Sequence, residues 1–263
     1  MIRQPQIVEI KDIVVETPTI KTFFFDWDEH VMPGEFVMIW NFENEKPMSV
    51  SKINDGEIAI TVKNVGEFTS NLHSLEVGDK LGIRGSYGSA FNTALEGEKI
   101  IAIGGGVGMA PINAISTHLA QNNDVSVISA AQTKDELLFC DSLEDAGVKV
   151  YPCTDDGSYG FEGFATNCLS DLLKSSTYNF AFVCGPEIMM KGIFDILEAS
   201  SINGEYSLER YMKCALGLCG QCCVDNTGWR ICVEGPVFTN TQLKQITEFA
   251  KYKRNASGTK MWF

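Results

Sequence analysis

Four cysteines near the end of the chain are spaced in a way that suits an iron–sulfur cluster. The sequence has nine cysteines in 263 residues, and four of them fall within residues 213–223. Cys214, Cys219 and Cys222 form a C-x4-C-x2-C pattern, and Cys232 follows after nine intervening residues. Three thiolates from one tight loop and a fourth from a separate segment can complete the two tetrahedral irons of a [2Fe–2S] cluster. We therefore predict that Cys214, Cys219, Cys222 and Cys232 are the cluster ligands.

Two other interpretations of these cysteines remain open. A structural zinc site usually combines two short C-x2-4-C pairs, whereas this stretch has one such pair and no histidine nearby. A set of buried free thiols is the second alternative. Gly217 and Gly220 favour the cluster, because they let the loop curl so that backbone N–H groups can point at sulfur. Cys223, which adjoins a predicted ligand, is left out of the set.

Two glycine-containing turns predict a nucleotide site in the middle of the chain. The stretch GGGVGMAP, residues 104–111, follows an apolar run and precedes a helix-length segment. Glycines allow close backbone approach, and a helix N-terminus favours phosphate, although a tight turn made for packing alone is the alternative. The stretch CGPEIMM, residues 184–190, should lie beside it at the carboxyl edge of a sheet. The candidate contacts are Gly104, Gly105, Gly106 and Gly108.

Composition narrows the class of protein. The chain is 44% hydrophobic and 21% charged, as in ordinary globular proteins. Its formal net charge of −13 argues against a nucleic-acid backbone as partner. The N-terminal stretch has no apolar signal segment, and no apolar run is long enough to span a bilayer. We therefore expect a cytoplasmic protein with no membrane partner, in which clustered cysteines bind metal more often than they form disulfides.

Hydrophobic patterning divides the chain into regions that would position these sites. Residues 1–95 contain short runs rich in Val, Ile, Phe and Thr between turn residues, which is typical of a small β-barrel. Residues 96–200 alternate apolar strands with helix-length segments, which indicates a parallel sheet covered by helices. Residues 201–240 break both patterns and carry the cysteines, and residues 241–263 are predicted to form a short helix and a polar tail. The expected fold class is therefore α+β with several domains.

The order of these motifs resembles the ferredoxin–NADP reductase superfamily. The β region carries PGEFVMIW (33–40), KPMSVS (46–51) and GSYGSAF (85–91), and the two glycine-containing turns follow. The resemblance implies an FAD-binding barrel, an NAD-binding α/β domain and a C-terminal [2Fe–2S] segment. Residues 207–238 and the stretch TDDGSYGFEG (154–163) narrow the match, because they resemble the electron-transfer subunits of NAD-linked (class 1B) dihydroorotate dehydrogenases.

The resemblance also implies roles for single residues. Lys46 would lie near the FAD diphosphate and Ser49 near the isoalloxazine edge, and the four cysteines match the cluster ligands. Lys46 stands where arginine is usual, so the charge is kept but the bidentate fork is lost. Phe68 stands where glycine is common. The positions that match FAD contacts are Lys46, Pro47, Met48, Ser49, Thr61, Val62, Lys63, Phe68 and Thr69.

The activity implied by the resemblance is an electron relay with no catalytic residue of its own. A partner subunit would oxidise dihydroorotate at an FMN, and electrons would pass through the cluster and FAD to NAD⁺ in pyrimidine biosynthesis. The expected assembly is a heterotetramer with two copies of each subunit. The expected interface is the cysteine loop together with the apolar segment 235–238. A transhydrogenase or sulfhydrogenase subunit is the nearer alternative, and a zinc-bearing non-enzymatic binding module is the farther one.

Overall fold

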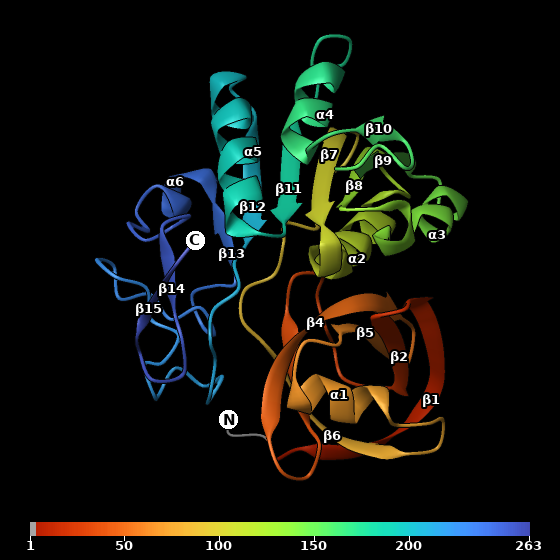
Figure 1. The fold of residues 1–263 in the computed structure, drawn as a ribbon, viewed down its shortest axis with the longest axis vertical. Coiled ribbons are helices and arrows are strands. Elements are labelled where there is room, and N and C mark those ends of the chain that lie inside the picture. The colour runs from red at the N-terminus through yellow and green to blue at the C-terminus, as the bar shows by residue number, and fades with distance from the viewer. Residues whose placement is uncertain (1–3) are drawn as a thin grey trace.

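The computed structural model describes residues 4–263, so the first three residues of the predicted barrel range lie outside the described residues. Figure 1 shows a closed barrel at the bottom of the view and a second sheet with its helices above it. The C-terminal part of the chain lies at the left of both, from the segment after β12 to β15. The expected fold class is confirmed.

The barrel consists of six antiparallel strands in the order β1-β2-β5-β4-β3-β6. Ile58, Ile60 and Val62 alternate along β5 and point into the barrel core, as the two-residue period of a strand requires. Between β5 and β6 lies α1 (Glu67–His73), whose Leu72 is fully buried against this core. The strands are β1 (Gln6–Thr17), β2 (Ile20–Asp26), β3 (Phe36–Trp40), β4 (Glu45–Asn54), β5 (Glu57–Lys63) and β6 (Lys80–Tyr87).

The second sheet has seven strands in the order β10-β9-β8-β7-β11-β12-β13. All pairs are parallel except β12 with β13. The strands are β7 (Lys99–Gly105), β8 (Asp124–Ala131), β9 (Lys149–Thr154), β10 (Phe161–Glu162), β11 (Phe180–Cys184), β12 (Asn203–Ser207) and β13 (Val237–Thr239).

Helices cover this sheet, which explains why its central strands are continuous apolar runs. Residues 100–105 of β7 are all buried. The helices are α2 (Met109–Leu119), α3 (Cys140–Asp145), α4 (Ala165–Leu172) and α5 (Glu187–Ala199). Among the described residues α5 is the longest helix, with 13 residues, and no helix there is both long and apolar enough to cross a membrane.

The cysteine-bearing segment is a long excursion from the sheet. It leaves after β12 and returns at β13, so these two strands of the range 201–240 belong to the seven-stranded sheet. After β13 the chain forms α6 (Asn240–Leu243) and then a hairpin of β14 (Tyr252–Arg254) and β15 (Lys260–Trp262). The sequence predicted a short helix and a polar tail here, and the structure shows a hairpin within that tail.

Candidate functional site

The structure brings the four predicted ligands together as two pairs of thiols. Side-chain contacts link Cys214 with Cys219 and Cys222 with Cys232. Cys222 and Cys232 are buried, Cys214 is half-buried and Cys219 is exposed. One pair lies within the tight loop, and the other joins the loop to the cysteine that arrives later in the chain.

The loop backbone is shaped around the sulfur of Cys214. Ala215 and Gly217 adopt left-handed conformations, with φ of 56° and 72°. The N–H groups of Leu216 and Cys219 point at Cys214 Sγ, with N–S distances of 3.4 and 3.5 Å. Burial raises the pKa of Cys214, but these backbone donors outweigh it and lower the pKa to about 7. The fold thus favours a thiolate at this position, the form that binds metal.

In the second pair, too, the pKa of one thiol is lowered. A hydrogen bond from Cys232 lowers the pKa of Cys222 to about 6 and raises the pKa of Cys232 itself. Only one thiol of a close pair can ionise easily, because two adjacent thiolates repel one another. A bound cation would remove that repulsion and allow both sulfurs to be thiolates.

This donor set fits a [2Fe–2S] cluster. Two pairs of thiols can supply two thiolates to each of two irons, and bridging sulfides complete both tetrahedra. Among residues 4–263 no three His, Cys, Asp or Glu side chains are placed to hold a single metal ion. A [2Fe–2S] cluster needs only two protein ligands per iron, so the paired arrangement meets its requirement. The donors at Cys214 Sγ are of the kind that tune such a cluster.

Arg230 supports the loop from within the same segment. Its Nη1 donates to the carbonyl oxygen of Gly217 at 3.1 Å, and its guanidinium pairs with Glu234. A Cβ at Gly217 would lie 2.9 Å from Arg230 Nη1 and 2.8 Å from a methyl group of Val233. Both the positive φ and this close approach therefore require glycine.

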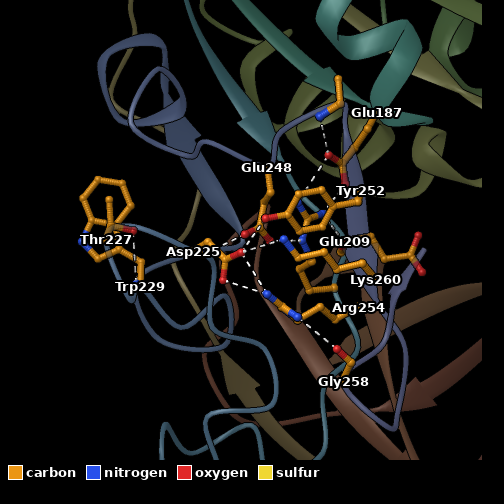
Figure 2. A network of polar contacts seen from close by, with 12 residues as sticks. Glu187, Glu209, Asp225, Thr227, Trp229, Glu248, Tyr252, Arg254, Gly258 and Lys260 are labelled. Carbon is orange, nitrogen blue, oxygen red and sulfur yellow. Dashed lines mark hydrogen bonds and ion pairs between the residues drawn. The ribbon is translucent and has the colours of Figure 1, made fainter. Parts of the chain in front are cut away.

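A buried ionic network attaches the segment to α5. Arg210 pairs with both Glu187 of α5 and Glu248, and none of these three residues is more than 6% exposed. The second carboxylate oxygen of Glu248 accepts from the backbone N–H of Asp225 at 2.6 Å. Figure 2 shows Glu187, Glu248 and Asp225 in one continuous network. The charges are therefore paired, which buried ions require.

The network continues into the C-terminal hairpin. Asp225 accepts hydrogen bonds from the Tyr252 hydroxyl and the Arg254 guanidinium, and Lys260 lies near the same carboxylate (Figure 2). Gln221, between two predicted ligands, donates to the carbonyl of Ala256 at 3.2 Å. The hairpin thus packs directly against the cysteine loop.

The first group of predicted flavin contacts lies in the first half of β4. Lys46, Pro47, Met48 and Ser49 are all half-buried. Met48 packs against the barrel core, so Pro47 and Ser49 point to the opposite face. Lys46 Nζ lies 5.3 Å from the ring centre of Tyr211, in the segment that leads into the cysteine loop.

The predicted contacts on β5 lie where the barrel meets α2. Thr61 points away from the barrel core, and its hydroxyl donates to Ser51 Oγ at 2.8 Å. Asn113 of α2 donates to the backbone oxygen of Ser51 at 2.8 Å. Val62 is part of the barrel core, and Lys63 is half-buried at the end of the strand. The face that holds Thr61 is therefore the boundary with the nucleotide domain.

Phe68 and Thr69, also predicted flavin contacts, lie in the first turn of α1. Phe68 packs against the barrel core. The Thr69 hydroxyl accepts from the N–H groups of Val65 and Gly66, at 2.9 and 3.0 Å. Both side chains help to hold the start of this helix in place.

The two glycine-containing turns lie side by side, as predicted, because β7 pairs with β11. A Cβ at Gly108 would come within 2.6 Å of the carbonyl oxygen of Cys184, so this glycine is explained by packing. Cβ atoms at Gly104 and Gly105 would likewise collide with neighbouring methionines. Gly106 differs, because its φ is 53° and nothing lies within 4 Å of its Cβ position. Gly106 therefore leaves open space at the start of α2.

The apolar segment 235–238 was expected at a subunit interface, and this expectation is wrong. Phe238 is 0% exposed and Val237 is 6% exposed. Phe238 stacks on Trp229 with the ring centres 5.7 Å apart. The apolar side chains that are exposed near the cysteines are instead those of Leu218 and Val233.

One residue that the sequence analysis missed connects the barrel to the cysteine loop. Arg84 of β6 donates from Nη1 to the carbonyl oxygen of Cys214 at 3.2 Å. Its Nε and Nη2 donate to the two carboxylate oxygens of Glu45, at 3.0 and 2.8 Å. Because Arg84 and Cys214 are 130 positions apart, no local pattern could have indicated the contact.

Comparison with protein-family models assigns two regions of the chain. Residues 209–244 match the iron–sulfur cluster binding domain of dihydroorotate dehydrogenase B. Residues 102–195 match the oxidoreductase NAD-binding domain. The first range contains all four paired cysteines, and the second contains the glycine-containing turns.

Solved structures share the fold. An NADH-dependent reduced ferredoxin-NADP oxidoreductase superposes with a TM-score of 0.80 and 25% identity, over 92% of this chain and 93% of that chain. A ferredoxin NADP⁺ reductase from Neisseria gonorrhoeae with bound FAD and NADP gives a TM-score of 0.65 and 18% identity, over 75% and 92% of the two chains. The second likeness concerns the fold alone.

Similarity to curated relatives extends over nearly the whole chain. A probable dihydroorotate dehydrogenase B (NAD(+)), electron transfer subunit, of Methanothermobacter thermautotrophicus is 50% identical, covering 98% of this chain and 97% of the relative. Its counterpart in Methanocaldococcus jannaschii is 45% identical, covering 99% of each. The paired cysteines, the barrel and the parallel sheet agree with this likeness, and the chain belongs to the family of dihydroorotate dehydrogenase B (NAD(+)) electron transfer subunits.

Proposed function

We propose that this chain carries electrons from the FMN of a dihydroorotate dehydrogenase catalytic subunit, through a [2Fe–2S] cluster and FAD, to NAD⁺ in pyrimidine biosynthesis. The observation that carries the proposal is the attachment of the cysteine loop to the barrel. Arg84 of the barrel donates to the Cys214 carbonyl, and Lys46 of β4 lies over Tyr211. A cluster held by this loop would therefore be adjacent to the strand that carries the predicted flavin contacts.

The overall reaction is dihydroorotate plus NAD⁺ to orotate, NADH and a proton, so two electrons pass through the chain per turnover. When bound, FAD would exchange single electrons with the cluster and a hydride with NAD⁺, which is the chemistry that such a relay requires. Oxidation of dihydroorotate itself belongs to the partner subunit. The role of this chain is to hold the groups in place and to set their electrostatic surroundings.

Each group has its own proposed residues. Cys214, Cys219, Cys222 and Cys232 would hold the cluster. Lys46 would neutralise the FAD phosphates, and Gly106 would leave room for a phosphate of NAD at the start of α2. The remaining proposed contacts are Pro47, Met48, Ser49, Thr61, Val62, Lys63, Phe68 and Thr69 for FAD, and Gly104, Gly105 and Gly108 for NAD.

We also propose a division of labour along the chain and an assembly. Residues 1–95 would bind FAD, residues 96–200 NAD and residues 201–240 the cluster, with residues 241–263 supporting the cluster segment. The chain would act in the cytoplasm as a heterotetramer with two copies of each subunit, without nucleic acid or membrane as partner. The exposed Leu218 and Val233, beside the cysteines, are the proposed contacts to the partner subunit.

The test of this function separates the chain from its partner. Alone, the chain should reduce a dye with NADH and should not oxidise dihydroorotate. After addition of the FMN subunit, dihydroorotate-dependent NAD⁺ reduction should appear. Oxidation of dihydroorotate by the chain alone, or no activity after addition of the partner, would contradict the proposal.

A flavin and iron–sulfur subunit of a transhydrogenase is the second candidate. It is favoured by the TM-score of 0.80 with the NADH-dependent reduced ferredoxin-NADP oxidoreductase. Purification of the native complex distinguishes the two functions. An FMN subunit that oxidises dihydroorotate should accompany this chain under the first proposal, and a subunit without that activity should accompany it under the second.

A further inference from the structure

We infer that Arg84 fixes the position of the cysteine loop against the barrel and thereby controls electron transfer between cluster and flavin. The inference rests on the proposed function. Arg84 does not contact the sulfur atom of any predicted cluster ligand, and it does not contact any of the predicted flavin-binding residues. Arg84 lies on β6, where it pairs with Met38 of β3, and it is 7% exposed. Its side chain reaches out of the barrel sheet to the backbone of the first predicted ligand, Cys214.

The guanidinium is held in a fixed orientation before it reaches the loop. Glu45 accepts two parallel hydrogen bonds from it, in the bidentate geometry that arginine forms with a carboxylate. The Tyr87 hydroxyl accepts a third from Nη1 at 3.0 Å. These bonds, with that to Glu45 first, raise the pKa of Arg84, so the side chain remains charged. Arg84 is therefore a rigid cation, and its donor to Cys214 has a defined direction.

The position of Glu45 relates the contact between Arg84 and Cys214 to the predicted flavin site. Glu45 directly precedes Lys46, the first predicted flavin contact, on the same strand β4. One buried side chain thus joins the strand of the predicted flavin site to the carbonyl of the first predicted cluster ligand. Movement of Arg84 would change the separation of the two groups, and the position of the redox groups is the part of such a reaction that the protein supplies.

Besides Lys46, which lies over Tyr211, two further supports of the cysteine segment do not cross to the barrel. Arg230 binds the carbonyl of Gly217 from within the cysteine segment. Asp225 is held by Arg254 of the C-terminal hairpin. Loss of either support would loosen the segment locally and leave the connection to β6 intact. A control must leave the segment itself unchanged, and Lys191 of α5, which forms an exposed ion pair with Asp195 outside the cysteine segment, meets this condition.

The effect of Arg84 can be divided into charge and position. Arg84→Gln removes a cation close to Cys214, and net charge near a cluster sets its reduction potential, so the cluster potential should become more negative. Arg84→Lys keeps the charge but cannot bind Glu45, Tyr87 and Cys214 at once, so the potential should stay near that of the parent. In both variants the loop should be less firmly attached to the barrel.

The experiment uses the full chain with its cofactors and measures two steps after mixing with NADH. In the parent, Arg84→Lys and Arg84→Gln proteins, the flavin absorbance should bleach at the same rate. The later bleaching of the cluster should be several-fold slower in both variants, and it should be unchanged in Lys191→Gln, which breaks an exposed ion pair on α5. A redox titration of the cluster, followed by its own absorbance, measures the potential independently of turnover.

Each outcome decides between the possible roles. Unchanged cluster bleaching and potential in Arg84→Gln would overturn the inference while leaving the proposed function intact. Unfolding of Arg84→Lys with loss of FAD and iron would assign Arg84 to stability alone and would also overturn it. Glu45→Gln, which keeps Arg84 but weakens its anchor, should reproduce the slow cluster step. A parent protein without flavin or iron would instead contradict the proposed function.

Discussion

Asp225 and Arg254 are 29 positions apart in the chain, and Arg254 Nη2 lies 2.9 and 3.1 Å from the two carboxylate oxygens of Asp225. Tyr252 donates to the same carboxylate. This ion pair folds the C-terminal hairpin onto the segment that carries the cysteines. The hairpin is thereby part of the architecture of the cluster segment.

The ion pair predicts a pH dependence of stability. The hydrogen bond from Tyr252 lowers the pKa of Asp225 in the folded chain; burial opposes it, and the hydrogen bond and charge of Arg254 add to the lowering. The unfolded carboxyl has a pKa of about 3.9, so the stabilisation is fully present above that value and is lost as the pH falls through the lower folded-state pKa. The free energy of unfolding, measured down to about pH 3, should therefore fall more steeply in the parent than in Asp225→Asn. Parallel curves would contradict this role.

Cofactor content is the most direct prediction. Two pairs of cysteines and one predicted flavin site lead us to expect two irons, two acid-labile sulfides and one FAD per chain. Anaerobically purified protein should be red-brown with flavin absorption bands. Elemental analysis and flavin release measure the ratios, and zinc, or close to four irons, would refute the cluster assignment.

Cys219→Ser should remove the cluster and leave the flavin in place. Cys219 lies in the exposed part of the loop, far in sequence from the barrel strands, so its loss should not disturb the fold. Iron content should fall to background, while FAD content and NADH-driven dye reduction stay close to the parent. Cys223→Ser is the control. Cys223 is outside both cysteine pairs, so this variant should keep the iron content of the parent. Loss of FAD in Cys219→Ser would show that the two sites are not independent.

Lys46→Ala should weaken the binding of FAD. A charge-assisted contact to phosphate contributes about 1.5–3 kcal/mol, which corresponds to a roughly tenfold to hundredfold loss of affinity. Flavin release during dialysis, followed by fluorescence, measures the change. Lys52→Ala on the same strand is the matched control, since Lys52 lies over the rings of Phe24 and Phe139 and is not a predicted contact. Equal retention in both variants would assign Lys46 to its contact with Tyr211 alone.

Arg210→Met should destabilise the chain strongly. Arg210 neutralises both Glu187 and Glu248, and removing one partner of a buried ionic group typically costs about 3–5 kcal/mol because unpaired charges remain. Denaturant unfolding should show this loss. Asp195→Ala breaks the exposed pair with Lys191 and should cost less than about 1 kcal/mol. A small effect of Arg210→Met would mean that water or rearrangement compensates the two carboxylates.

Most of the architecture could be predicted from the sequence, because its signals are local. The alternating and continuous apolar runs predicted the barrel and the parallel sheet, since each period is set by the geometry of a strand within one segment. The spacing of the cysteines predicted that four of them would meet, because a tight loop must present three of them together, and the structure brings these four together as two pairs. The glycine-containing turn at residues 104–108 was likewise visible within a few positions, although only the structure separated Gly106 from the glycines required by packing.

The connections between these parts were decided by the tertiary structure. Phe238 looked like an interface residue in the sequence, but it is fully buried against Trp229. An apolar side chain is compatible with a subunit interface and with the core of the chain, and only its neighbours in space distinguish the two. The residues after Thr241 predicted a short helix and a polar tail, but not the hairpin that Tyr252 and Arg254 attach to Asp225. Arg84 and Cys214 meet across 130 positions. Such contacts depend on where distant segments come together in space, and no local period or spacing encodes that.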